Sequence, residues 1–512
     1  MERHRKTLTA AIRAHKTEIL AVILILLVAA FLRLYKIREF VIFLGDEGRD
    51  ALVVKRMIVD HKFTLLGPTA SVGGFYLGPV FYYFMIPFLW LFAFDPVGPA
   101  VMVALIGIAT VGLLYWVVRS WANPIAAGIA AALYATAPGV VSASRSSWNP
   151  NIMPFFALLS VFALSKALSK NRTIWYLIAG AAYGILIQSH YLGLVIGPVL
   201  AVATLITLPV KRWLKAALLE FSGFIIGASM FLAFEVRHNF PNTRTIIEFV
   251  SRGGDTTGPR SWNLFWLFYE MLRRNFESVL LPMGLLIKGL LLVSLVGFLL
   301  YAYRQRTEKK RLPIGLTTFL VWLVVGAFGI GAYKGQLYPH YFGFLFPLPF
   351  ILMGITGAVM YQYKKGRKVA VLMIFALVVL NLSNQKIWVQ GSNLVDQTKN
   401  VSQKIIEVAD GKPFNFALIA NGNSDHAYRY FLEITGQKPT PLEEEVTEQL
   451  VVVCENLDAP CEPLGHPLWE VAGFGRAEVV QEASVHPGIK IVGLRHHESS
   501  LELIGKPAPK GG

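Results

Sequence analysis

The sequence predicts a polytopic α-helical membrane protein with a small α/β domain at its C-terminal end. Hydrophobic residues make up 54% of the 512 residues and charged residues only 16%, a composition that excludes an ordinary soluble protein. Apolar runs long enough to cross a bilayer recur through most of the chain. After Gln385 the sequence becomes mixed and polar. We therefore predict a membrane domain over 1–390 and an extracytoplasmic domain over 391–512.

The spans are predicted from apolar runs that each approach the ~20 residues a membrane-crossing helix needs. About eleven such runs lie near 17–35, 97–118, 124–141, 152–169, 173–190, 191–210, 216–235, 284–303, 313–333, 341–362 and 369–385. The first follows a basic N-terminus and lacks a small-residue cleavage site, which predicts a retained helix; a cleaved signal peptide is the alternative.

The apolar stretch 74–94 is ambiguous, and the basic residues of the short loops decide it. If 74–94 does not cross the membrane, all basic loops lie on the same side. If 74–94 does cross, the basic N-terminus lies on the opposite side from all later basic loops. Pro79, Pro87 and many aromatic residues fit a helix at the outer interface. We therefore predict a protein of the cell membrane whose N-terminus is cytoplasmic. Its loop at 36–96 and its C-terminal domain are predicted to lie on the outer side.

Charge and cysteine content narrow the function classes. The formal charge of +16 comes from short clusters of Lys and Arg between apolar runs, so we predict topology signals and no nucleic-acid partner. Cys454 and Cys461 provide neither a disulfide framework nor a zinc pattern; one disulfide and two buried thiols both stay open. In the C-terminal region FNFALIA and QLVVVCE predict strands, and DHAYRYFLEI predicts an amphipathic helix.

Residues 44–51, LGDEGRDA, are the first candidate site. A helical spacing of apolar residues predicts an amphipathic helix along the membrane. Those positions are Ala51, Val54, Met57 and Ile58. Asp46 and Glu47 at its start are either a helix cap and dipole partner, or carboxylates of which one accepts a proton from an incoming nucleophile. Arg49 and Asp50 are expected to be helix-surface charges.

Further candidates lie at the predicted outer ends of helices. Together they suit an anionic lipid-linked substrate whose phosphate lies at headgroup level. For each segment the alternative is an interfacial anchor or a turn residue. The candidates are Arg145, Asn149 and Asn151 of SASRSSWNPN, His190 and Tyr191 of QSHYLG, Arg237 and His238 of FEVRHNFPNT, and Lys334, His340 and Tyr341 of YKGQLYPHYFGFLFPLPF.

These segments resemble the GT-C glycosyltransferases, especially the protein O-mannosyltransferase and aminoarabinose transferase branch. The resemblance rests on GDEGRD, the Pro-containing aromatic stretch YLGPVFYYF, the SRSSWNPN turn and HYFGFLFPL. It implies a GT-C fold, a polyprenyl-phosphate-linked monosaccharide donor and transfer to a hydroxyl acceptor on the outer face. It also implies that Asp46 is the general base and that Glu47 helps to hold the acceptor. Arg145, Arg237 and His238 are similar in placement to basic groups of the family, the latter two near the donor phosphate.

Two departures from the family pattern limit what the resemblance implies. The stretch GGFYLGP lacks the Glu-Lys pair that aminoarabinose transferases carry before their Pro, which argues against a lipid A acceptor. Asn149 and Asn151 stand where the family often has an acidic residue, which weakens a metal role. No metal site and no required cofactor are predicted, although a divalent cation stays open.

The expected mechanism is a single inverting displacement. Asp46 takes the acceptor proton, and the leaving phosphate is stabilised by Arg145, Arg237 and Lys334. The main rival is a transporter or flippase of lipid-linked saccharides, which would place ionisable groups near the midplane and often contain repeats. A membrane-anchored scaffold is a second rival. The sequence leaves open the sugar, the acceptor and the oligomeric state.

Overall fold

The computed structural model describes residues 16–70, 73–251, 263–280, 283–333, 335–455 and 460–508. The chain forms two compact units. The helical unit comprises Met1–Ile37, Thr64–Phe84 and Ala100–Val389, and the sheet unit comprises Arg38–Phe63, Met85–Pro99 and Gln390–Gly512. The sheet unit thus includes parts of the predicted outer loop. The functional division into 1–390 and 391–512 stays a prediction.

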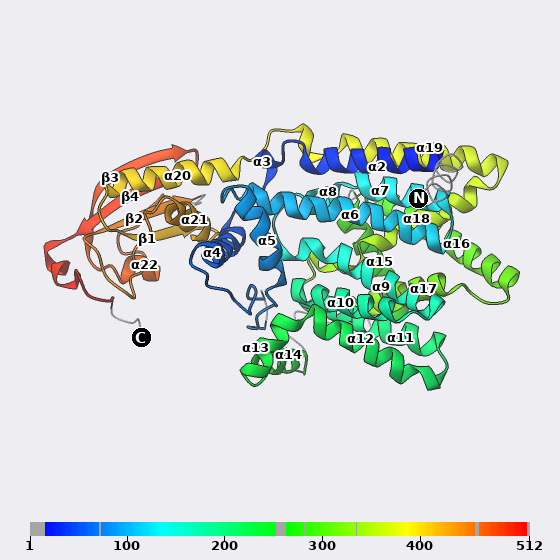
Figure 1. The fold of residues 1–512 in the computed structure, drawn as a ribbon. Coiled ribbons are helices and arrows are strands. Elements are labelled where there is room, and N and C mark those ends of the chain that lie inside the picture. The colour runs from blue at the N-terminus through cyan, green and yellow to red at the C-terminus, as the bar shows by residue number, and fades with distance from the viewer. Residues whose placement is uncertain are drawn as a thin grey trace, which may run out of the picture. The chain divides into compact units, whose positions relative to one another are not determined.

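Helices account for nearly all of the helical unit (Figure 1). Each of the predicted apolar runs coincides with one helix or with two consecutive helices. The helices, some of which extend into the sheet unit at their ends, are α2 Lys16–Leu34, α5 Val80–Leu91, α6 Val97–Trp121, α7 Pro124–Thr136, α8 Pro138–Ala143, α9 Met153–Lys170, α10 Thr173–Ser189, α11 Ile196–Thr207, α12 Trp213–Gly227, α13 Ser229–Arg237, α14 Pro241–Ser251, α15 Leu264–Val279, α16 Gly284–Lys309, α17 Ile314–Ala332, α18 Pro347–Tyr361 and α19 Lys364–Ser383.

The polytopic helical class is confirmed. Within the described part of the chain, six helices are long and apolar enough to cross a membrane, and eight spans result if each of two bent pairs counts as one. The pairs are Val210–Gly227 with α13, bent by 84°, and η4 Pro339–Leu345 with α18, bent by 54°. Helix α5 has 12 residues, about 18 Å, which is shorter than the ~30 Å hydrocarbon core. That length fits the prediction that 74–94 does not cross, while the number of spans stays a prediction.

The predicted small C-terminal domain is present as a four-stranded sheet, and the two predicted strands and the predicted helix are confirmed. The strands follow the order β1-β2-β4-β3. The first two are parallel and the other pairs are antiparallel. The elements are β1 Asn415–Ala420, β2 Gln449–Glu455, β3 Ala477–His486, β4 Ile489–His496, α20 Leu394–Ala409, α21 His426–Ile434 and α22 Trp469–Ala472.

Both faces of the central strand β2 are covered, because alternate residues of this strand enter different cores. Val451 and Val453 pack with α20 and α21 on one face. Leu450 and Val452 pack with Phe474 and the segment around α22 on the other face. Figure 1 shows the two helices and α22 on opposite sides of the strands. The edge strand β3 is instead largely exposed.

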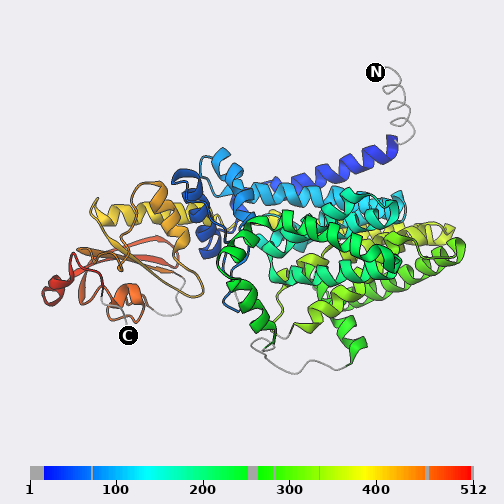
Figure 2. The ribbon, with the colours of Figure 1, turned by 60° about the horizontal axis from the view of Figure 1, so that its bottom comes forward.

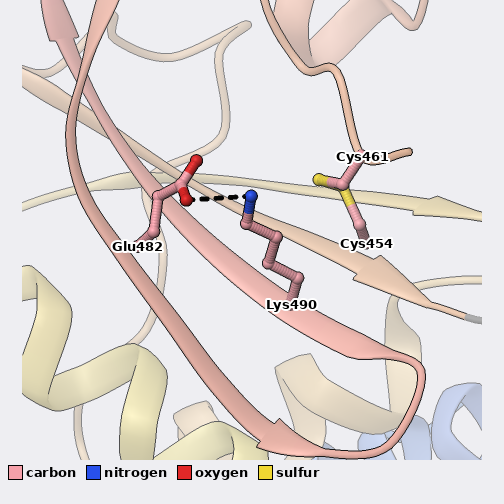
Figure 3. Close-up of a disulfide and its surroundings, with 4 residues drawn as sticks. All are labelled: Cys454, Cys461, Glu482 and Lys490. Carbon is pink, nitrogen blue, oxygen red and sulfur yellow. Dashed lines mark ion pairs between the residues drawn. A yellow bond between two sulfur atoms is a disulfide. The ribbon is translucent and has the colours of Figure 1, made fainter.

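The two cysteines form a disulfide (Figure 3). It joins Cys454 at the end of β2 to Cys461, seven residues further along the chain. Lys490 lies opposite Cys454 on β4, and its Nζ pairs with Glu482 Oε2 at 2.9 Å. Of the two alternatives left by the sequence, the structure has the disulfide.

Candidate functional site

Three of the predicted outer segments come together in the helical unit. The ring of His340 lies 4.4 Å from that of Trp148 and 5.8 Å from that of His190, measured between ring centroids. His190 also lies 4.3 Å from Tyr191 and 4.8 Å from Tyr341. We call this group the aromatic cluster. Its members are Trp148, His190, Tyr191, Tyr333, Tyr338, His340 and Tyr341.

Breaks between helices bring these rings together. Helix α10 ends at Ser189, and His190 takes an extended backbone with φ −167° and ψ 141°. Its Nδ1 accepts the backbone N–H of Leu192 at 3.2 Å, so the neutral ring carries its proton on Nε2. His340 and Tyr341 lie in η4, which has a proline at its first position, where the missing N–H costs nothing. The rings therefore stand at chain turns and present polar atoms at their edges.

Two asparagines hold the turn beside the cluster. Asn149 Nδ2 donates to the carbonyl oxygen of Ser189 at 2.6 Å, which ties the turn to the end of α10. Asn151 Nδ2 donates to the carbonyl oxygen of Ser146 at 3.0 Å and closes the turn itself. These bonds match the turn-residue alternative, and substrate binding by the two amides stays a prediction.

The loop before α5 also contacts the cluster. Phe75 is buried and meets Tyr191 edge to face at 5.8 Å. The next residue, Tyr76, donates its backbone N–H to Asn242 Oδ1 at 2.8 Å, and Asn242 Nδ2 donates to the fully buried Glu235 at 2.9 Å. Sequence reasoning missed Phe75 and Glu235. The one available signal was an acidic residue shortly before the Pro-Asn-Thr start of α14.

Arg145, which follows α8 in the chain, packs against the C-terminal end of α2. Arg145 is buried, and its guanidinium donates to the carbonyl oxygens of Leu32 at 2.7 Å and Tyr35 at 2.8 Å. Arg33, a residue of α2, is fully buried and donates from Nη1 to two backbone carbonyls. Sequence reasoning missed Arg33 because it lies inside an apolar run. These contacts match the anchor alternative for Arg145, and its contact with a donor phosphate stays a prediction.

The remaining basic candidates are placed differently. Arg237 and His238 are exposed at the end of α13. His238 stacks on Phe234 at 4.2 Å, and its Nδ1 lies 2.9 Å from the carbonyl oxygen of the same residue. None of the ring contacts described for His238 involves the aromatic cluster. Lys334 lies outside the described residues. A role near the donor phosphate stays a prediction for all three.

In the sheet unit, LGDEGRDA opens helix α4, Gly45–Val59. The predicted amphipathic helix is confirmed, with Ala51, Val54 and Met57 buried. The helix packs on α21, and Arg56 near its end pairs with Glu433 of that helix. The acidic motif is therefore held by the C-terminal domain.

The carboxylates of this motif have different environments. The Asp46 side chain is 54% exposed, and its Oδ1 accepts Nη1 of Arg49 at 2.9 Å. Asp50 is fully buried and accepts Arg49 Nε at 3.0 Å and Nη2 at 2.9 Å. The expectation that Asp50 is a surface charge is therefore wrong. Arg49 bridges the two aspartates, and such charge-assisted bonds fix the geometry of both.

Glu47 is the capping carboxylate. Its Oε2 accepts the backbone N–H of Leu44, the N-cap residue, at 3.2 Å. Burial raises the pKa of Glu47 to about 7, because the charged form loses its hydration. This bond matches the capping alternative for Glu47, and its expected contact with the acceptor stays a prediction. Asp46 is instead an accessible carboxylate whose described bond is to Arg49.

Two further expectations concern the site as a whole. Within the described ranges, no three His, Cys, Asp or Glu side chains are grouped so that they could hold a metal ion. The need for a divalent cation stays a prediction. The expected convergence of Asp46 with Arg145, Arg237 and His340 also stays a prediction, because Asp46 belongs to the sheet unit and the others to the helical unit.

The sequence and the structure are similar to those of known membrane glycosyltransferases. Residues 77–234 match the family described as dolichyl-phosphate-mannose-protein mannosyltransferase. A comparison with curated protein sequences gives no match. The structure is similar to ArnT from Cupriavidus metallidurans bound to undecaprenyl phosphate, with 16% identity, a TM-score of 0.57 and coverage of 94% of this chain and 98% of that chain.

Archaeal structures show the same likeness. AglB from Archaeoglobus fulgidus, an oligosaccharyltransferase in complex with an inhibitory peptide and a dolichol-phosphate, matches with 13% identity and a TM-score of 0.52, covering 86% of this chain and 70% of that chain. The Archaeoglobus fulgidus oligosaccharyltransferase complex with Zn and sulfate matches with 14% identity and a TM-score of 0.51, covering 84% and 67%. The chain therefore has the fold of the GT-C membrane glycosyltransferases, the superfamily that its sequence resembles.

Proposed function

We propose that the protein transfers a monosaccharide from a polyprenyl-phosphate donor to a hydroxyl acceptor on the outer face of the membrane, with inversion. The observation that carries this proposal is Asp46, an accessible carboxylate held by Arg49 at the start of a helix, in a chain with the GT-C fold. Glu47 supports the helix start on which Asp46 stands. The mannosyltransferase family match over 77–234 supports the same class of reaction.

The chemistry requires one proton acceptor. The acceptor hydroxyl gives its proton to the Asp46 carboxylate while its oxygen forms a bond to the anomeric carbon. The bond between that carbon and the phosphate oxygen breaks, and its electron pair leaves with the polyprenyl phosphate. A phosphodiester needs no general acid to leave when cations compensate its charge. A single carboxylate is therefore sufficient, unlike the carboxylate pair of a glycosidase.

The helical unit offers a place for a lipid chain. Residues of α10, α11 and α12 line a cavity of about 840 Å³. Helix α12 contacts both of the other helices, and all three belong to the teal and green part of the helical unit in Figure 2. Its lining is mostly apolar and includes Tyr183, Leu200, Trp213 and Phe224. The volume is within the range of ligand sites, and apolar walls suit a hydrocarbon chain. The polyprenyl phosphates named with ArnT and AglB support this assignment of the donor.

The aromatic cluster is suited to a neutral sugar. The faces of aromatic rings carry partial negative charge and attract the weakly positive C–H groups of a pyranose face. His190 Nε2 and the tyrosine hydroxyls can bond sugar hydroxyls at its edge. We propose that the cluster orients the sugar of the donor and that Asp46 supplies the proton chemistry.

One observation favours the transporter alternative. Glu220 lines the apolar cavity and accepts a hydrogen bond from Thr204 Oγ1 at 3.2 Å. Intramembrane carboxylates mark substrate or proton pathways in transporters. A glycosyltransferase of the proposed kind does not need this group, so the experiment below includes a transport measurement.

The test uses the full-length protein in lipid nanodiscs with a panel of polyprenyl-phosphate sugars and measures release of polyprenyl phosphate. Replacing Asp46 by Asn is expected to lower turnover by about 10²- to 10⁴-fold, the usual contribution of a general base. Asp60→Asn is the matched control, because Asp60 lies at the other end of the same helix. It is expected to leave turnover unchanged.

Two outcomes would overturn the proposal. Undiminished turnover by the Asp46→Asn variant would remove Asp46 as the base. No turnover of any donor by the wild type, together with movement of a lipid-linked saccharide between the leaflets of proteoliposomes, would establish the transporter.

A further inference from the structure

The start of α4 is tied to the C-terminal domain within the sheet unit. The backbone N–H of Gly45, the first residue of α4, cannot bond within the helix, and it donates to Asn423 Oδ1 at 3.0 Å. The packing around this bond is close. A Cβ at Gly45 would lie 2.0 Å from Ser424 Oγ, and a Cβ at Gly48 would lie 2.3 Å from the backbone nitrogen of Ala427. The first turn of α4 therefore lies directly against the segment that leads into α21.

Asn423 connects this contact to the end of strand β2. Its Nδ2 donates to Glu455 Oε2 at 2.9 Å. Because an ionised carboxylate only accepts hydrogen bonds, Glu455 fixes which way the Asn423 amide faces. Its Oδ1 is left to accept the backbone N–H groups of Gly45 and of Ser424, the latter at 2.9 Å. If the amide were turned over, Nδ2 would face these two donors and both bonds would be lost.

Glu455 is itself held in place. It is the last residue of β2 and is buried, and it pairs in register with Ala420 of β1 and Ile489 of β4. The oxygen that accepts the Asn423 amide also accepts the hydroxyl of the buried Tyr428 at 3.1 Å. A buried charge needs such partners. The carboxyl end of the central strand is therefore a fixed point to which the start of α4 is aligned.

We propose that Glu455 is a positioning residue for Asp46. Through the amide of Asn423 it fixes the backbone of Gly45, and with it the direction in which the next residue presents its carboxylate to the acceptor. This inference rests on the proposed function of Asp46. Arg49 holds the Asp46 side chain, whereas Glu455 sets the backbone on which that side chain stands. Such alignment matters because a general base must lie within hydrogen-bond reach of the group it deprotonates, and a misplacement of about 1 Å can cost about 10²-fold in rate.

The test is the kinetics of transfer by the full-length protein in nanodiscs. Glu455→Leu keeps most of the side-chain volume and removes the acceptor of the Asn423 amide. It is expected to lower kcat by about tenfold to a hundredfold with the donor KM unchanged. Asn423→Ala should lower kcat to the same extent, because it breaks the same connection. Glu455→Gln should keep a kcat near that of the wild type, since its amide oxygen can still accept both bonds.

Tyr428→Phe is the matched control. It removes the other hydrogen bond to the same oxygen of Glu455 and leaves the bond to Asn423 in place. It should keep the wild-type kcat, whatever change thermal unfolding shows in its stability. The positioning role is overturned if Glu455→Leu keeps the wild-type kcat. It is also overturned if Tyr428→Phe or Glu455→Gln loses as much kcat as Glu455→Leu, since the loss would then follow any disturbance of this region.

Combination with Asp46→Asn shows whether Glu455 acts through Asp46. Residues that act as a unit have non-additive effects, so Glu455→Leu should cause little further loss of kcat in the Asp46→Asn protein. A further loss as large as that in the wild type overturns the positioning role. Undiminished turnover by Asp46→Asn alone overturns the proposed function itself, whereas low turnover by that variant with an unchanged kcat in Glu455→Leu overturns the positioning role alone.

Discussion

The aromatic cluster of the helical unit and the first turns of α4 in the sheet unit differ in chemistry. The cluster consists of rings whose polar atoms are ring nitrogens, hydroxyls and an indole N–H. The start of α4 carries Asp46, Glu47 and Asp50 with Arg49 among them. Rings of this kind select the shape of a neutral sugar, whereas carboxylates move protons. The proposed function therefore assigns sugar recognition to one compact unit of the chain and proton chemistry to the other.

The effects of substitution should separate in the same way. Variants of the cluster should change affinity and leave the pH dependence alone. Variants around α4 should change pH dependence, either of turnover or of stability. Three experiments besides that on Asp46 test this separation, in order of decreasing expected effect.

Replacing Glu47 by Gln should have the largest effect on stability. The pKa of Glu47 is raised from 4.5 to about 7 in the folded protein. Protonated Glu47 therefore stabilises the folded state fully at pH values below its pKa in the unfolded chain, and this stabilisation is lost as the pH rises through 7. Gln can still accept the Leu44 N–H but has no charge to bury. At about pH 8 the variant should be more stable than the wild type by on the order of 3 kcal/mol.

The measurement is thermal unfolding of the full-length protein in detergent across this pH range. Glu407→Gln serves as the control, since the side chain of Glu407 is 64% exposed in the same unit. If the stability of the wild type and of the Glu47→Gln variant depends on pH in the same way, the pKa of Glu47 is not raised by burial. The start of α4 would then not differ from the aromatic cluster in its pH dependence.

Removing the disulfide should have a smaller effect, one that is independent of pH near neutrality. Cys454 and Cys461 close a short loop, and loss of that constraint should lower the free energy of unfolding of the sheet unit by about 2 kcal/mol. Reducing agent should lower the unfolding temperature of the wild type and leave a Cys454→Ser, Cys461→Ser double variant unchanged. Equal responses of both proteins would contradict the expected stabilisation.

Replacing His340 by Ala should have the smallest effect and tests the helical unit. His340 contacts Trp148 and Tyr341 in the cluster. Loss of one aromatic contact with the donor sugar, worth about 0.5–1.5 kcal/mol, should raise the donor KM by roughly tenfold or less. Tyr363→Ala, at an exposed ring, is the control. Kinetics at several pH values decide the outcome: a changed pH profile in His340→Ala would show that the cluster takes part in proton transfer, and would break the comparison.

Much of the fold could be predicted because hydrophobic length is a local property. The predicted apolar runs coincide with helices, and FNFALIA, QLVVVCE and DHAYRYFLEI have the predicted structure. The amphipathic helix α14 was not anticipated, and neither was α15 with its four charged residues. Both helices are amphipathic, with apolar residues on one face only. A search for continuous apolar runs therefore does not detect them.

The site could be predicted only in part, because its members meet through tertiary contacts. His190, His340 and Tyr341 were named from their places at helix ends, and the structure brings them together. Asp50 was misplaced, since nothing in GDEGRD shows which face of α4 meets α21. The close approach of Gly48 to Ala427 could not be anticipated either, because no local pattern links residues on separate helices at such a distance in the chain.

In the sheet unit the backbone N–H of Gly45 donates to Asn423 Oδ1 at 3.0 Å, and this bond sets an order of events in biosynthesis. Helix α4 emerges early, but its partner follows 378 residues later, on the order of 20–80 s at ~5–20 residues per second. During that interval the acidic motif exists without the surface that fits its glycines. A chain that stops short of Asn423 would carry every residue of the motif and still lack the finished environment of Asp46, so the last part of the chain to be made completes one of the first.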